Sequence, residues 1–235
     1  MEIMKVKSKV DSNIELSVTP GHFSSDRFHV NYYIDMSNLK MRMSEAKKVA
    51  AAMAKQYIKK VDIDHKYMSP LINAETLIEN NASVTPIDTI ICMDGCEVIG
   101  AYLAQELSRS GIRCMNAHET IYVTAPEQDI NGQMIFRDNT KLMVQGKNVL
   151  ILSTSITTGV TLDKAIDSVE YYGGRVQGIA SVFSFISKAR GVEVNSIFGA
   201  KDMKGYASYD ARVCPMCKAK QKIDAIVNGF GYSKM

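Results

Sequence analysis

The sequence lacks a hydrophobic run long enough to cross a membrane, and it lacks a marked charge of either sign. The longest apolar stretch, Val49 to Ala54, is far shorter than the ~20 residues that span a bilayer, and the N-terminal residues contain no apolar signal-peptide region. Lysine and arginine total 28 against 25 acidic residues, and basic residues cluster only in pairs. These absences argue against membrane and nucleic-acid partners, and we expect a cytoplasmic protein.

The motifs of several common enzyme classes are also missing. No G-x-x-x-x-G-K-[ST] occurs, and no G-x-G-x-x-G follows a strand, which excludes the commonest nucleotide-binding loops. The absence of H-E-x-x-H and G-x-S-x-G leaves zincin proteolysis and serine hydrolysis without support. The cysteines number five, an odd count that indicates reduced thiols rather than a disulfide framework.

What the sequence does contain is typical of a globular chain that buries a core. Its 235 residues are 46% hydrophobic and 23% charged, which favours one compact domain with a small elaboration. We expect an N-terminal hood, a long helix and an insertion over 1–86, an α/β core over 87–199, and a C-terminal tail over 200–235.

The hydrophobic pattern predicts strands that alternate with helices. Thr89 to Met93 is a short β-branched run of the kind that a sheet buries on both faces, and Asn148 to Leu152 repeats the pattern. Each run precedes a helical apolar stripe that glycine ends, at Gly111 and at Gly173. The expected strands span 89–93, 148–152, 176–183 and 192–197, and the expected helices span 44–58, 98–107 and 162–172. This alternation predicts an α/β fold with a central, mainly parallel sheet flanked by helices.

Two further segments lie outside this pattern. Residues 120–136 look like a hairpin around an Asn-Gly turn, an arm that could cover a site. Residues 62–86 are polar and rich in turn residues, and we expect an insertion or linker there, with a short helix possible over 71–79.

Ligands of open parallel sheets bind beyond the carboxyl ends of the strands, so the loops after Met93 and Leu152 are the candidate sites. The second loop combines six hydroxyl residues with one glycine just before a helix. Hydroxyl donors, backbone N–H groups and the positive end of the helix dipole together suit a phosphate dianion. A Ser/Thr-rich turn that only caps the helix is the alternative. The candidate residues are Ser153, Thr154, Ser155, Ile156, Thr157, Thr158, Gly159, Val160 and Thr161.

Asn148 to Leu152 followed by Ser153 to Thr161 resembles the phosphoribosyl-diphosphate signature of type I phosphoribosyltransferases, most closely orotate phosphoribosyltransferase. The resemblance implies that Thr157 to Thr161 wraps the 5-phosphate. Other segments match the family in order. Residues 20–24 and 32–36 resemble the segment before its first long helix, residues 120–136 its catalytic flap, and Asp94, Gly95, Cys96 and Glu97 its diphosphate loop.

The resemblance implies a phosphoribosyltransferase-type sheet with a small N-terminal hood, and a homodimer. It also implies Mg²⁺-dependent transfer of phosphoribosyl from phosphoribosyl diphosphate to a base, orotate being the family's nearest acceptor, with Mg²⁺ held through the substrate diphosphate.

The sequence departs from the family at two places. Ser153 and Thr154 stand where the family has two acids that hold the ribose hydroxyls, and residues 119–134 contain no lysine for the flap. We therefore assign no catalytic residue. The alternative function is a catalytically inactive sensor that binds a phosphorylated ribose or nucleotide.

The tail contains a C-x-x-C motif formed by Cys214 and Cys217, a pattern that also occurs in half of a zinc site or in a redox pair. No second C-x-x-C occurs, and the four histidines show no metal spacing. We therefore expect two free thiols and no metal, and keep zinc at Cys214 and Cys217 as the alternative.

Overall fold

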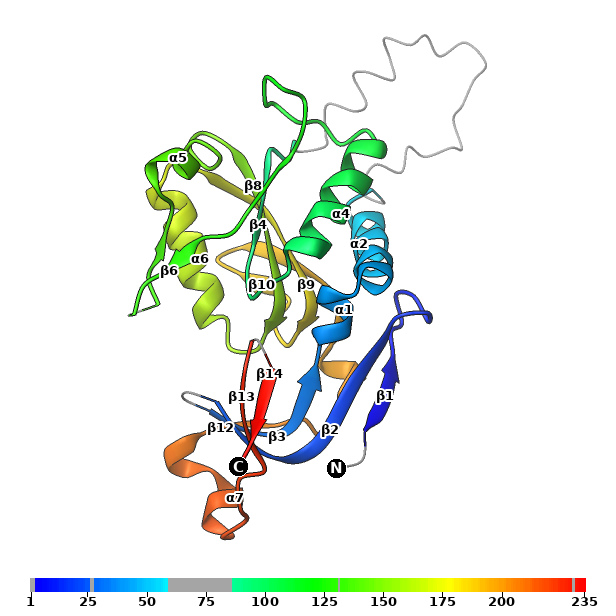
Figure 1. Ribbon diagram of the computed structural model, residues 1–235, viewed down its shortest axis with the longest axis vertical. Helices are drawn as coiled ribbons and strands as arrows, with labels where there is room; N and C mark the ends of the chain where they lie inside the picture. Colours follow the sequence, from blue (N-terminus) through cyan, green and yellow to red (C-terminus); the bar gives the residue numbers. More distant parts are fainter. Residues whose placement is uncertain (1–2, 26–27, 59–85, 131, 230) are drawn as a thin grey trace.

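The computed structural model describes residues 3–25, 28–58, 86–130, 132–229 and 231–235. They form two six-stranded sheets, one above the other in Figure 1, and one two-stranded sheet. The upper sheet belongs to the core and the lower one to the hood, where both chain termini lie. The segment expected as an insertion over 62–86, with its possible helix, lies outside the described residues except for Pro86.

The core sheet has the strand order β10-β11-β9-β8-β4-β5, and every neighbouring pair is parallel except β10 with β11. The predicted α/β class with a mainly parallel central sheet is therefore confirmed. The strands are β4 (Thr89–Cys92), β5 (Tyr122–Thr124), β8 (Asn148–Ile156), β9 (Arg175–Ser184), β10 (Lys188–Ala189) and β11 (Val192–Gly199).

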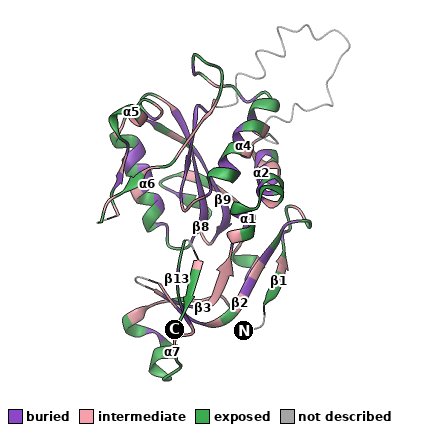
Figure 2. Cartoon of the chain, in the orientation of Figure 1, coloured by how far each residue is buried: buried purple, intermediate pink, exposed green. Residues whose placement is uncertain are grey.

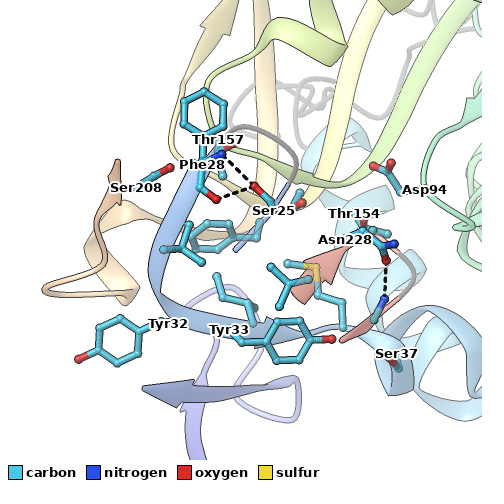
Figure 3. Close-up of a pocket in the computed structure, with 18 of the residues that line it drawn as sticks. Ser25, Phe28, Tyr32, Tyr33, Ser37, Asp94, Thr154, Thr157, Ser208 and Asn228 are labelled. Atoms are coloured by element: carbon cyan, nitrogen blue, oxygen red, sulfur yellow. Dashed lines mark hydrogen bonds between the residues drawn. The ribbon is translucent and has the colours of Figure 1, made fainter. Parts of the chain in front are cut away.

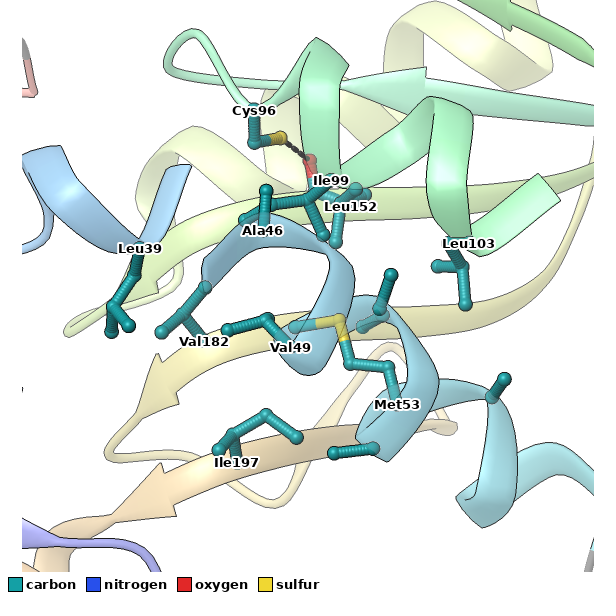
Figure 4. Close-up of a cluster of buried hydrophobic side chains, with 14 of the residues drawn as sticks. Leu39, Ala46, Val49, Met53, Cys96, Ile99, Leu103, Leu152, Val182 and Ile197 are labelled. Atoms are coloured by element: carbon teal, nitrogen blue, oxygen red, sulfur yellow. Dashed lines mark hydrogen bonds between the residues drawn. The ribbon is translucent and has the colours of Figure 1, made fainter. Parts of the chain in front are cut away.

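Helices cover both faces of this sheet. Because successive strand residues point to opposite sides, Ile90 packs with α2 (Met43–Ile58) and α4 (Glu97–Arg109), whereas Ile91 packs with α6 (Val160–Tyr171). Figure 2 shows the buried strands between exposed helix faces, and Figure 4 shows α2 and α4 side chains meeting over the sheet. None of the described helices is long and apolar enough to pass through a bilayer.

The helix ends follow the sequence closely. Gly111 and Gly173 have φ values of 76° and 78°, and each follows its helix in the left-handed region that glycine adopts without strain. After Gly111, the N–H of Ile112 closes the last turn of α4 by donating to the Leu107 carbonyl at 3.1 Å. Gly100 has a packing role, since a Cβ there would lie 2.4 Å from Cys92 Sγ, so glycine lets α4 approach β4.

The hood sheet joins both ends of the chain, in the order β12-β3-β2-β13-β14 with β1 also paired to β2. Its register is irregular between Pro20 and Phe23, at a bulge in β2. The strands are β1 (Met4–Lys7), β2 (Glu15–Ser24), β3 (Phe28–Asp35), β12 (Ser208–Asp210), β13 (Ala225–Asn228) and β14 (Gly231–Lys234). The tail thus completes the sheet that the N-terminal strands begin.

Two predicted boundaries differ from the structure. The loop expected to begin at Ser153 begins after Ile156, because Ser153, Ser155 and Ile156 continue the pairing of β8 with β9. The expected hairpin over 120–136 shrinks to β6 (Glu127–Gln128) and β7 (Met134–Ile135), because Tyr122–Thr124 pairs with β4 as an edge strand instead.

Short helical segments connect the larger elements. They are α1 (Ser37–Met41), α5 (Asp138–Lys141), η4 (Ala200–Asp202), η5 (Ala211–Val213) and α7 (Pro215–Lys218).

Candidate functional site

A cavity of about 330 Å³ lies between the hood and the carboxyl edge of the core sheet. Its walls come from β3 and α1 on the hood side, from the ends of β4 and β8 on the core side, and from the tail loop that follows β13. Figure 3 shows Asp94, Thr154 and Asn228 near one another at one end of this cavity. The fold therefore brings the two predicted loops together beneath the hood.

A second, smaller hollow of about 50 Å³ lies in the turn between β8 and α6 and is lined by Thr158 and Gly159. Ser155, Thr157 and Thr161 line both this hollow and the large cavity, so the two spaces adjoin. The predicted phosphate loop thus opens into the cleft under the hood.

Gly159 gives this turn its shape. Its φ is 84°, and it precedes the first residue of α6 in the left-handed region, which strains other residues. A Cβ at this position would also lie 3.1 Å from Ile186 Cδ1. The turn directs the first N–H groups of α6, together with the exposed threonines 157, 158 and 161, toward the space where an anion would sit.

Asp94 is the one predicted diphosphate-loop residue that lines the cavity. It follows β4 with a φ of 57°, and its Oδ2 accepts a hydrogen bond of 3.2 Å from Ser153 Oγ. Burial raises the pKa of the Asp94 carboxyl, while the Ser153 hydrogen bond and nearby Lys40 act in the opposite direction. One carboxylate from β4 therefore lies against the hydroxyl residues at the end of β8.

Lys40 is a residue of the site that no sequence motif indicates. This α1 side chain is only 2% exposed, and its Nζ donates to the carbonyls of Asp94 at 2.8 Å and Gly229 at 2.5 Å. Its amine thus ties the hood, the β4 loop and the tail loop together at one point. Its partners are 54 and 189 residues away, so no local pattern points to it.

The tail loop forms the remaining wall. A Cβ on Gly229 would lie 3.3 Å from Asp94 Oδ1, which means that the tail backbone approaches the carboxylate closely. Three tyrosines line the cavity, Tyr32, Tyr33 and Tyr206, and burial raises the pKa of Tyr33 and of Tyr206 to about 12. Both phenols are therefore neutral at physiological pH, and they add aromatic surface rather than charge.

Other predicted residues face elsewhere. Cys96 is buried in the core, where its Sγ donates to the Leu152 carbonyl at 3.3 Å (Figure 4), and Glu97 is exposed on the first turn of α4. The β6–β7 hairpin contacts α6, where Ser168 Oγ donates to the Met134 carbonyl at 3.0 Å. The described residues of this hairpin line neither the cavity nor the phosphate hollow.

Among solved structures, the fold resembles those of phosphoribosyltransferases. Orotate phosphoribosyltransferase of Mycobacterium tuberculosis in complex with inorganic phosphate is 15% identical, with 73% of this chain and 80% of that chain covered and a TM-score of 0.43. A phosphoribosyltransferase from Corynebacterium diphtheriae is 17% identical, covering 79% and 89%, with a TM-score of 0.45. Hypoxanthine phosphoribosyltransferase of Trypanosoma cruzi is 15% identical, covering 67% and 78%, with a TM-score of 0.40.

No protein family matches the sequence, and no curated protein matches it. At the identities of the solved structures, the resemblance concerns the fold alone. The ligand must be inferred from the side chains of the site.

Proposed function

We propose that this protein binds a phosphoribosyl compound, with the 5-phosphate in the Thr157–Thr161 turn and the ribose beneath the hood. The observation that carries the proposal is the continuity of the two spaces, since Ser155, Thr157 and Thr161 line both. A phosphate in the small hollow would receive hydrogen bonds from hydroxyls and from the α6 N-terminus, which are strong when the acceptor is charged. The sugar attached to it would then extend into the larger cavity.

The first function that we propose for this site is Mg²⁺-dependent transfer of phosphoribosyl from phosphoribosyl diphosphate to a base. Asp94 suits Mg²⁺, because this ion usually takes one or two protein carboxylates together with substrate phosphates. The raised pKa of Asp94 supports the fit, since burial leaves its negative charge incompletely compensated. Bound Mg²⁺ would neutralise diphosphate charge, while Asp94 and the hydroxyl of Thr154 would orient the ribose and Ser153 would hold Asp94 in place.

The walls of the cavity favour a planar, uncharged base as the acceptor. Aromatic side chains contribute surface for packing against a ring, from the β3 residues Phe28 and Tyr33 and from Tyr206. Lys40 is the only lysine or arginine among the described residues that line the cavity, and its amine already donates to two carbonyls. We therefore expect a base without a carboxylate to bind better than orotate.

The second candidate is a sensor that binds the same ligand without transfer. Two observations favour it. Hydroxyls replace the acids that the family resemblance would require at positions 153 and 154, and Ser153 Oγ already donates to Asp94. The β6–β7 hairpin packs on α6 and its sequence contains no lysine.

One experiment separates the two functions. The full chain is incubated with Mg²⁺, phosphoribosyl diphosphate and a panel of bases, and diphosphate release is measured beside calorimetric binding of ribose 5-phosphate. Release that depends on one base supports transfer, and saturable binding without release supports the sensor. If the protein binds neither ribose 5-phosphate nor phosphoribosyl diphosphate, the proposed phosphoribosyl site is wrong.

A further inference from the structure

A cluster of four potential metal ligands lies in the hood, and none of the four lines the candidate ligand cavity. We name it the hood cluster. Its residues are His22, His29, Cys214 and Cys217. One ligand atom from each residue lies within 4.8 Å of all the others, and three of the four residues are buried. The sequence separates the histidines from the cysteines by about 190 positions, so only the fold brings them together.

The spacing of these atoms is close to that of a tetrahedral zinc site. With Zn–S near 2.3 Å and Zn–N near 2.0–2.1 Å, a tetrahedron places nitrogen about 3.6 Å from sulfur and the two nitrogens about 3.3 Å apart. The sulfur–nitrogen distances to His22 Nε2 are 3.7 Å from Cys214 and 3.6 Å from Cys217, and Cys217 Sγ lies 3.2 Å from His29 Nδ1. The two ring nitrogens are 2.9 Å apart. Small movements would therefore complete the tetrahedron.

The orientation of His22 also suits a metal. Its Nδ1 lies 2.9 Å from the carbonyl of Gln221, an acceptor that requires the proton on Nδ1. Nε2 is then left with its lone pair, and this is the atom that faces both thiols. Metal-bound histidines commonly hold their second nitrogen against a carbonyl in this way.

Both flanks of the C-x-x-C turn are anchored to the histidine strands. Before the turn, β12 pairs with β3, with Tyr209 opposite His29. After it, β13 pairs with β2 beside Phe23, and the His22 N–H donates to Asp224 Oδ2 at 2.8 Å. The bulge in β2 lies between Pro20 and Phe23, a stretch that contains His22, and a bulge redirects side chains relative to regular pairing. Pairing on both sides thus brings the α7 turn to the hood sheet, below whose strands it lies in Figure 1, and its two cysteines to the histidines.

We propose that the hood cluster is a structural zinc site that fastens the tail to the N-terminal strands. Two sulfur and two nitrogen donors in a mostly buried, closed arrangement are the set that tetrahedral zinc prefers. Binding replaces the two thiol protons with one Zn²⁺, and no side chain changes its redox state. The site would hold β13, which leads directly to Asn228 and Gly229 at the ligand cavity.

The test measures metal in the full chain, produced without a polyhistidine tag and dialysed against metal-free buffer. Elemental analysis is expected to find one zinc ion per chain. Cobalt added to the zinc-stripped protein is expected to give the intense visible absorption of a tetrahedral site and a thiolate charge-transfer band. Neither measurement depends on a phosphoribosyl ligand, so the zinc proposal and the proposed function can fail independently.

Variants identify the ligands. Cys217→Ser, at the exposed rim of the cluster, and His29→Asn are each expected to reduce zinc retention to near zero after dialysis. Cys114→Ser is the matched control, since Cys114 is a partly buried free cysteine outside the cluster, and it is expected to retain zinc fully. If these variants fail to fold, the cobalt spectrum of the unaltered protein still decides the question.

Two results would overturn the proposal. One is unaltered protein that holds no zinc as purified and gives only a weak octahedral cobalt spectrum, which would leave a hydrogen-bonded cluster in which one imidazole donates to the other. The other is zinc retained equally by the cluster variants and the Cys114→Ser control, which would place the metal elsewhere.

Discussion

The core sheet and the far end of the hood are built on very different amounts of buried apolar surface. The core strands pack against α2 and α4 on one face and α6 on the other, in two large clusters of buried side chains. At the far end of the hood, a separate cluster contains only four buried residues, Phe23, Val30, Ala225 and Val227. The hood cluster of histidines and cysteines lies beside this small group, because His22 precedes Phe23 and His29 precedes Val30.

The phosphate turn and the hood cluster are therefore held in place by different kinds of contact. The phosphate turn belongs to one continuous strand, turn and helix, and core packing fixes its shape. The tail strand β13 has few apolar contacts of its own, and small hydrophobic groups rarely stabilise a fold without a disulfide or a metal. A zinc crosslink would supply what packing does not, and would keep the tail loop against Asp94.

The largest effect that we expect follows from removal of zinc. Zinc contributes ~10–16 kcal/mol to the folding of finger peptides, so the hydrogen-exchange protection of β13 and its partner residues in β2 should fall at least ~100-fold on chelation. The protection of β8 and β9 should change little, because their contacts are to the core. Exchange measured peptide by peptide, with and without chelator, checks this. An equal loss of protection in both sheets would contradict the conclusion that the hood and the core are stabilised separately.

The next effect concerns the phosphate turn. Thr158→Ala removes an exposed hydroxyl that we expect to donate to a charged phosphate, and the loss of such a bond costs ~1.5–3 kcal/mol, or about 10- to 150-fold in affinity. Titration calorimetry with ribose 5-phosphate measures this change, and Thr140→Ala, a threonine outside both cavities, is the control. The thermal midpoint should stay constant in both variants. Unchanged affinity in Thr158→Ala would contradict the proposed phosphate contact and would leave the turn only as the start of α6.

The local features of the fold could be predicted from the sequence, whereas the features that join distant segments could not. The strands at Thr89 and Asn148, the helix at 44–58 and the glycine helix ends depend on periodicity within about 15 residues, and the structure confirms them. The predicted phosphate turn lies at the carboxyl edge of the sheet, but β8 extends to Ile156 because Ser153, Ser155 and Ile156 continue its pairing with β9.

The remaining features of the site arise from long-range contacts. Lys40 gains its role from a carbonyl 189 residues away in the sequence. The histidines of the hood cluster show no metal-binding spacing in the sequence, and they meet the two cysteines only because the tail pairs with their strands. A C-x-x-C motif was the one visible signal of that cluster. It left free thiols and zinc as alternatives, since nothing near Cys214 in sequence supplies the other ligands.

A smaller effect should follow from Asp94→Asn. Burial raises the folded pKa of Asp94 above its ordinary value of 3.8, so the folded protein favours the neutral carboxyl. In the absence of ligand, the unaltered protein should therefore lose stability relative to the variant as the pH rises from 3.8 through the folded pKa. At neutral pH the variant should be the more stable of the two, and it should also lose Mg²⁺-dependent binding of phosphoribosyl diphosphate.

Denaturant unfolding across this pH range measures the stability of both proteins. A variant that is less stable at neutral pH would mean that Lys40 and the hydroxyls outweigh the burial of the charge. Retained Mg²⁺-dependent binding would remove Asp94 from the proposed ion site.

The smallest effect should come from Ser153→Ala, which removes the hydroxyl that donates to Asp94 Oδ2. A hydrogen bond to a carboxylate favours the charged form, so its loss should raise the pKa of Asp94 further, at a cost of ~1.5–3 kcal/mol at most for the ionised state. Mg²⁺-dependent binding should then require a higher pH, while binding of ribose 5-phosphate without Mg²⁺ stays close to that of the unaltered protein. Calorimetry at several pH values separates the two. If ribose 5-phosphate binding weakens without a shift in the pH dependence, Ser153 contacts the ribose directly rather than acting through Asp94.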